Sequence, residues 1–178
     1  MIGRFLGAVS LSNTRTPLKY LIMTLISVVA FFIIGLSTSF TSAAVYLVFL
    51  VVNLIAFLIG KSLPHRTLYI FAFVNLILLI IALTNTGGIA LWTIIGMGLF
   101  NSIMWSNIFT LSISGLGKYT SQGSSLLVMM ILGGALLPLI MGLVADKFGV
   151  HMSFIVPVFS YIYIAYYGIS GYKPKKYD

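Results

Sequence analysis

The sequence predicts an all-α membrane protein, a polytopic bundle of six transmembrane helices. Two features of its composition carry this prediction: 60% of the residues are hydrophobic and only 7% are charged, against about 25% charged residues in ordinary soluble proteins. A chain of 178 residues cannot bury so much apolar surface in its own interior, so lipid must cover the rest.

The third observation is that the apolar residues form six long runs. A spanning helix needs roughly 20 mostly apolar residues, and we place the spans at 20–36, 43–60, 67–84, 89–113, 124–145 and 152–170. Helices are expected because backbone groups in lipid must bond within their own segment, and the alternation typical of a membrane barrel is missing. The connections are short, which leaves no room for a soluble domain.

The basic residues predict the orientation of the bundle. Positively charged loops stay in the cytoplasm, and nine of the ten basic residues fall on one side of the predicted spans, with Lys147 on the other. The nine are Arg4, Arg15, Lys19, Lys61, Arg66, Lys118, Lys173, Lys175 and Lys176. Both termini are therefore expected in the cytoplasm. The net charge of +8 does not indicate a nucleic-acid partner, because these residues are dispersed between apolar runs rather than gathered in one patch.

The fourth run contains the most unusual polar residues, in the stretch "GLFNSIMWSNIFTLSIS" at 98–114. At 100° per residue, Asn101 and Trp105 share one face of a helix with Gly98 and Ser112. The adjoining face holds Ser102, Ser106 and Phe109. An amide beside an indole ring suits a sugar, because the amide bonds hydroxyl groups and the ring covers an apolar C–H face. The alternative is that Asn101 bonds a neighbouring helix, an interaction worth roughly 0.6–2 kcal/mol in membranes.

The other spans carry weaker signals. Gly134, Pro138 and Gly142 recur every four residues in the fifth run, which is typical either of close helix packing or of a bending helix that helps a gate move. For the single amides Asn53 and Asn75, helix–helix contact is the favoured role.

No reactive constellation is present in the sequence. His65 and His151 have no partner at metal-ligand spacing, and there is no nucleophile–base pair, phosphate loop or acid pair, so we predict no enzyme, cofactor or metal. The interiors of the spans carry no charge, whereas a proton-coupled carrier usually keeps a carboxylate in the membrane. Any coupling residue must therefore lie elsewhere.

Several motifs, in order, resemble the C-terminal half of the fucose:proton symporter family of the major facilitator superfamily, which includes bacterial glucose/galactose transporters. They are "GLFNSIM…IF", "GLGKYTSQGS", "GGALLPL", "ADKFG" and "SFIVPVFSYIYIAYYG", with "MIGRFLGA" at the start resembling the "GRF-x-G" end of an earlier helix. The likeness is strong from about residue 98 to residue 172 and weak from 13 to about 67.

This resemblance implies part of a twelve-helix secondary transporter that works by alternating access and binds a monosaccharide near mid-membrane. The expected sugar contacts are Asn101, Ser102, Trp105 and Phe109. We expect residues 1–19 to form a cytoplasmic segment that ends a preceding helix, 20–170 the bundle, and 171–178 a basic cytoplasmic tail. The expected partners are lipid, the sugar and a missing N-terminal half, in a bacterial inner membrane. A stand-alone six-helix partner or scaffold protein is the alternative.

Two departures from the family pattern stand out. Six spans follow "GRF-x-G" where four are expected, so the first two spans are interpreted as an inserted hairpin of unknown role. In addition, "MWSNIF" replaces the usual "M-F-P-x-I-F", so that Trp105 and Ser106 stand where Phe and Pro are common. Without the proline, the kink expected at this point of the helix is removed.

Overall fold

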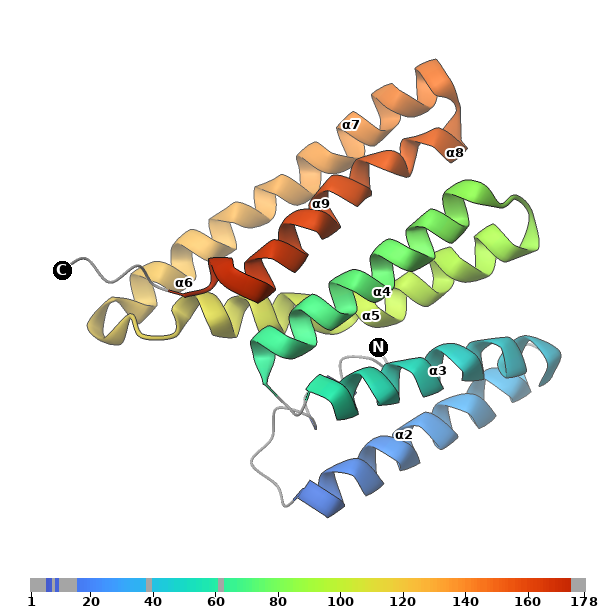
Figure 1. The fold of residues 1–178 in the computed structure, drawn as a ribbon, viewed down its shortest axis with the longest axis horizontal. Helices are drawn as coiled ribbons and strands as arrows, with labels where there is room; N and C mark the ends of the chain where they lie inside the picture. Colours follow the sequence, from blue (N-terminus) through green and yellow to red (C-terminus); the bar gives the residue numbers. More distant parts are fainter. Residues whose placement is uncertain (1–5, 8, 10–15, 38–39, 61–62, 174–178) are drawn as a thin grey trace.

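The computed structural model describes residues 6, 7, 9, 16–37, 40–60 and 63–173, and they are helical apart from short turns. The long helices in chain order are α2 (Thr16–Ser37), α3 (Phe40–Gly60), α4 (Pro64–Thr84) and α5 (Gly88–Ile113). After α5 come α6 (Thr120–Met129), α7 (Gly133–Phe148), α8 (Val150–Ser153) and α9 (Ile155–Tyr166) (Figure 1). The all-α membrane bundle predicted from the sequence is confirmed.

The predicted spans correspond to these helices. Among the described residues, five helical segments are long and apolar enough to cross a membrane, and α3 adds a shorter apolar stretch over Ala44–Gly60. The fifth predicted span is interrupted: a 3₁₀ turn at Met130–Leu132 separates α6 from α7. Pro138 lies inside α7, and because proline has no N–H, the Gly134 carbonyl receives no helical hydrogen bond from it.

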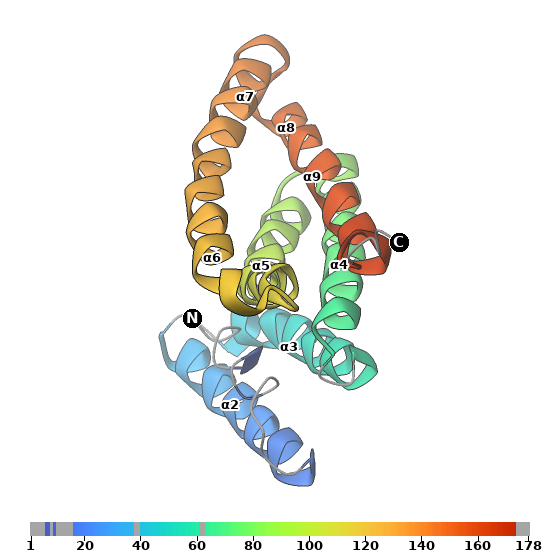
Figure 2. The same cartoon turned by 90° about the vertical axis from the view of Figure 1, so that its left-hand side faces the viewer.

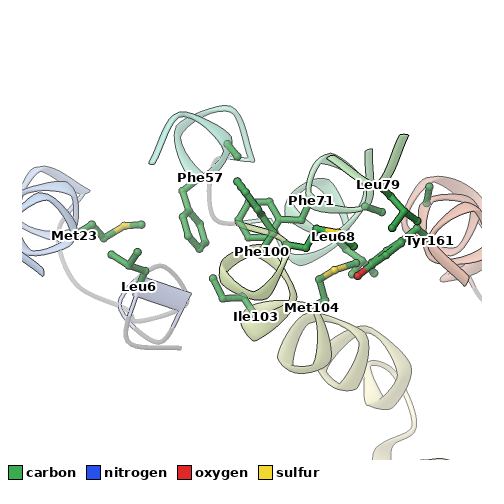
Figure 3. Close-up of a cluster of buried hydrophobic side chains, with 14 residues drawn as sticks. Leu6, Met23, Phe57, Leu68, Phe71, Leu79, Phe100, Ile103, Met104 and Tyr161 are labelled. Atoms are coloured by element: carbon green, nitrogen blue, oxygen red, sulfur yellow. The ribbon is translucent and has the colours of Figure 1, made fainter. Parts of the chain in front are cut away.

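The core of the protein lies between α3, α4, α5 and α9. Phe71 of α4 is fully buried, and its ring meets Phe57 of α3 at 5.0 Å and Phe100 of α5 at 5.5 Å, both edge to face. Figure 3 shows these rings together with the aliphatic side chains around them. Such aromatic pairs prefer this geometry because the positive ring edge meets the negative ring face.

Two parts of the chain flank this core. The α2–α3 hairpin forms a layer of its own, joined to α4 and α5 through α3 (Figure 2). Gly96 of α5 permits this approach, because a Cβ there would lie 2.5 Å from the ring of Phe49. On the other side, α6 and α7 form a continuous column with no buried residue. Most of the surface of this column is therefore left uncovered by the described residues.

The two ends of the bundle differ in charge. The start of α4, the α5–α6 connection and the end of the chain lie at one end, and the α4–α5 and α7–α8 turns lie at the other (Figure 1). Arg66, Lys118 and Lys173 thus share the first end, whereas Lys147 is at the second. The predicted terminal segments 1–19 and 171–178 fall largely outside the described residues.

The second end is held together by His151. Its Nε2 lies 2.8 Å from the carbonyl oxygen of Ala82 and 3.0 Å from that of Asn85. Carbonyl oxygens only accept hydrogen bonds, so Nε2 carries the proton and donates. This contact joins α8 to the end of α4, which gives a structural role to a histidine that the sequence left unassigned.

Candidate functional site

A polar cluster joins three helices inside the apolar bundle. Asn101 of α5 accepts two hydrogen bonds at its Oδ1, from Asn75 Nδ2 of α4 at 3.2 Å and from the Tyr161 hydroxyl of α9 at 2.9 Å. Asn75 Nδ2 also lies 3.4 Å from Met104 Sδ. We call Asn75, Asn101 and Tyr161 the amide node. The helix–helix contact expected for Asn75 is thus present, and Asn101 makes such a contact as well.

Asn101 also lines a hollow of about 340 Å³ between α5, α7 and α9. Most of the lining is apolar, and the polar side chains in it are Asn101, Ser160 and Tyr161. Small ligands are commonly held in this way, by an apolar wall with a few polar groups that fix their orientation. The remaining lining residues are Gly134, Leu137, Pro138, Met141, Pro157 and Ile164.

The other predicted sugar contacts lie along α5. The Trp105 side chain is 44% exposed, and its ring centroid lies 6.4 Å from that of Phe109 in a tilted arrangement. Asn101, Trp105 and Phe109 are spaced four residues apart, so the helix presents them in a row. Ser102 differs, because its hydroxyl donates to the Leu99 carbonyl of the same helix at 2.6 Å.

Of the three small or helix-bending residues predicted to matter in the fifth span, two lie at the site. Gly134 and Pro138 line the hollow, whereas Gly142 does not. A Cβ added at Gly134 or Gly142 would meet no atom within 4 Å. The close packing considered for this face is therefore not made with any described helix, and the face stays open.

Tyr161 and Ser160 were not predicted as site residues. Tyr161 is only 7% exposed, and its hydroxyl donates a hydrogen bond to Asn101 Oδ1. Its position near the middle of the span, away from the interface that tyrosine prefers, is the signal that distinguishes it. Asn53, for which helix–helix contact was also expected, is fully buried, and neither of its amide atoms has a hydrogen-bond partner among the described residues.

The described residues therefore form a bundle of helices long and apolar enough to cross a membrane, with a hydrogen-bonded polar cluster between three of them. The chain is 50% identical over 114 residues to the glucose/galactose transporter of Brucella abortus biovar 1 (strain 9-941), a match that covers 64% of this chain and 26% of the relative. It is 37% identical over 124 residues to a putative glucose/galactose transporter of Helicobacter pylori (strain J99), covering 67% of this chain and 30% of that protein.

A third relative is the L-fucose-proton symporter of Escherichia coli (strain K12), 36% identical over 92 residues, which are 52% of this chain and 21% of the symporter. No family model matches the sequence, and no solved structure matches it. The chain belongs to the major facilitator family of fucose- and glucose/galactose-type sugar transporters. It spans about a quarter of the length of the curated relatives that it matches.

Proposed function

We propose that the chain forms the C-terminal portion of a proton-coupled sugar transporter of the fucose/glucose/galactose type that works by alternating access. The observation that best supports this proposal is the hollow between α5, α7 and α9, whose largely apolar lining includes the polar side chain of Asn101. The names of the relatives support a sugar as the transported molecule. The resemblance of the motifs from residue 98 onwards supports the C-terminal half as the part of the transporter that this chain forms.

In this proposal Asn101, Trp105 and Phe109, which follow one another at four-residue intervals along α5, contact the sugar. The free amide nitrogen of Asn101 donates to a sugar oxygen, and the ring of Trp105 covers an apolar C–H face. Trp105 suits this role because its large ring stays exposed on the same side as Asn101. Phe109 extends the apolar surface, and Ser102, whose hydroxyl is already bonded to its own helix, contributes at most an acceptor.

The other half of the transporter would cover the faces that this chain leaves open. The α6–α7 column has no buried residue, and Gly98 on the α5 face meets nothing within 4 Å of an added Cβ. Gly134, Pro138 and Gly142 then serve as a flexible, close-approach surface, because Pro138 weakens the helix at the point where it borders the hollow. Proton coupling falls to the other half, since the only acidic residues of this chain are Asp146 and Asp178.

We place the protein in a bacterial inner membrane with both termini in the cytoplasm. The basis is the nine-to-one distribution of basic residues, together with the grouping of Arg66, Lys118 and Lys173 at one end of the bundle. Residues 1–19 and 171–178 would then be cytoplasmic segments on either side of the bundle at 20–170.

Sugar counterflow tests this function. The full-length protein that contains this chain is reconstituted in liposomes loaded with glucose, galactose or L-fucose, and entry of the labelled sugar is followed. We expect exchange of at least one of these sugars and its loss in Asn101→Ala, with the variant still monodisperse in detergent. Ser106→Ala, an exposed neighbour on the same helix, is the matched control and should exchange normally. A protein that exchanges none of these sugars would favour the partner or scaffold alternative.

A further inference from the structure

The amide node fixes which end of the Asn101 amide faces the hollow. Asn75 is fully buried in α4, and one of its amide atoms lies within reach of two acceptors, Asn101 Oδ1 at 3.2 Å and Met104 Sδ at 3.4 Å. That atom is the nitrogen, because the thioether sulfur of Met104 has no hydrogen to donate, so an oxygen in this place would lie against the lone pairs of the sulfur. Asn75 therefore presents N–H groups, and only N–H groups, to α5.

The orientation of Asn101 follows from that of Asn75. Since Asn75 Nδ2 can only donate, the Asn101 atom that meets it must be the carbonyl oxygen. The Tyr161 hydroxyl lies 2.9 Å from this same oxygen and donates to it. Both lone pairs of Oδ1 are thus occupied, one from α4 and one from α9. If the amide turned over, its nitrogen would meet the N–H groups of Asn75 and the bond to α4 would be lost, while the Tyr161 hydroxyl could stay bonded only as an acceptor.

The nitrogen at the other end of the Asn101 amide is left without a partner. Asn101 is exposed, and no described residue accepts a hydrogen bond from its Nδ2. Because Asn101 lines the hollow between α5, α7 and α9, its two N–H donors are offered to whatever occupies that space. Asn101 itself therefore recognises an acceptor oxygen rather than a donor.

We infer that Tyr161 and Asn75 are positioning residues, which hold the Asn101 amide so that its Nδ2 donates to an acceptor oxygen of the bound sugar. This inference rests on the proposed function and names the chemistry of its site. The terminal torsion of asparagine is otherwise broad and roughly two-fold, so a free Asn101 would offer oxygen and nitrogen to the ligand in turn. Fixing it removes the wrong orientation and the entropy cost of choosing the right one.

The inference predicts how the three residues depend on each other. Asn75 and Tyr161 act through Asn101, so removing either should weaken sugar binding only while Asn101 is present. Interhelical hydrogen bonds in membranes are worth on average about 0.6 and at most about 1.7 kcal/mol, which corresponds to about a three- to twentyfold change in affinity. The maximal transport rate should change less, because the sugar still enters and leaves by the same path.

A double-mutant cycle in the full-length protein tests this. Tyr161→Phe keeps the ring in the core and removes only the hydroxyl; Tyr163→Phe, two residues along α9 and 68% exposed, is the matched control. Sugar affinity is measured by equilibrium binding, and KM and maximal rate by counterflow. We expect Tyr161→Phe to raise Kd and KM about three- to twentyfold, Tyr163→Phe to change neither, and Tyr161→Phe to have no further effect in the Asn101→Ala background.

The failure of the inference and that of the proposed function give different results. If Asn101→Ala weakens sugar binding but Tyr161→Phe does not, or if the two effects add, Tyr161 does not act through Asn101 and the positioning role is overturned. If Asn101→Ala leaves affinity unchanged in a protein that transports sugar, the contact itself is wrong and the inference falls with it. If the unmodified protein binds no sugar, the proposed function is wrong. Asn75→Leu removes the other donor to Asn101 Oδ1 and has a similar side-chain volume. Combining it with Asn101→Ala gives a second double-mutant cycle, which tests the positioning role of α4 in the same way.

Discussion

The aromatic core offers a direct test of how the helices are held together. Phe71 makes two edge-to-face ring contacts, with Phe57 at 5.0 Å and with Phe100 at 5.5 Å, and so joins α3, α4 and α5. Aromatic pairs of this kind are worth about 0.5–1.5 kcal/mol each. Phe71→Ala should therefore lower the free energy of unfolding by about 1–3 kcal/mol through these pairs alone.

The membrane environment sets an upper bound on this effect. In soluble proteins Phe→Ala in a core costs about 3–5 kcal/mol, but that figure includes transfer of the ring to water. A helix that separates from its neighbours in a bilayer keeps its side chains in an apolar solvent, so the transfer contribution is largely lost and packing remains. We therefore expect a loss below about 3 kcal/mol.

Unfolding in mixed detergent–SDS micelles, followed by circular dichroism, measures this difference. Phe73→Ala is the matched control, because Phe73 lies on the same helix but is 48% exposed towards lipid. Its removal should change the free energy of unfolding by less than about 0.5 kcal/mol. Equal destabilisation by the two substitutions would refute the assignment of a packed α3–α4–α5 core, as would a Phe71→Ala variant as stable as the unmodified protein.

Three further predictions follow from close contacts and from the site. Gly168→Ala should destabilise the protein by about 1–3 kcal/mol, because a Cβ there would lie 3.0 Å from the backbone nitrogen of Tyr69, whereas Gly88→Ala, at an exposed position with no described atom within 4 Å of the added Cβ, should be neutral in the same SDS titration. His151→Leu should lower the free energy of unfolding by about 1 kcal/mol, because the hydrogen bonds from His151 to two backbone carbonyls are lost. An unchanged free energy of unfolding would show that His151 does not help to hold α8 against α4. Trp105→Ala should raise the KM for sugar counterflow about two- to thirteenfold, as expected for a ring contact worth about 0.5–1.5 kcal/mol, and an unchanged KM would exclude Trp105 from the site.

The positions of the spans could be predicted because apolar length is a property of the sequence alone. The run at 67–84 is apolar apart from Asn75 in its middle and a threonine at each end, and α4 ends at Thr84 as expected. The break between α6 and α7 could not be predicted in the same way: the residues at Met130–Leu132 are as apolar as their neighbours, and hydropathy does not distinguish a 3₁₀ turn from an α-helix.

The site could be predicted only in part, for a similar reason. The spacing of Asn101 and Trp105 placed them on one face of a helix, because that depends on local geometry. The partners of Asn101 could not be found, because Asn75 lies 26 residues and Tyr161 60 residues away in the chain. Helical periodicity says nothing about which neighbouring helix meets which. The two interpretations of Asn101 also proved compatible: its oxygen bonds other helices, and its nitrogen remains available.

The central claim is that the hollow between α5, α7 and α9 forms part of a sugar site in a transporter. The chain has no cysteine, so a single Ser160→Cys substitution, in a cysteine-free version of the full-length protein, reports on the hollow through its rate of alkylation. We predict that saturating transported sugar slows alkylation at position 160 several-fold and leaves that of Ser125→Cys, on the exposed side of α6, unchanged. Alkylation at position 160 that is indifferent to every transported sugar would contradict the account.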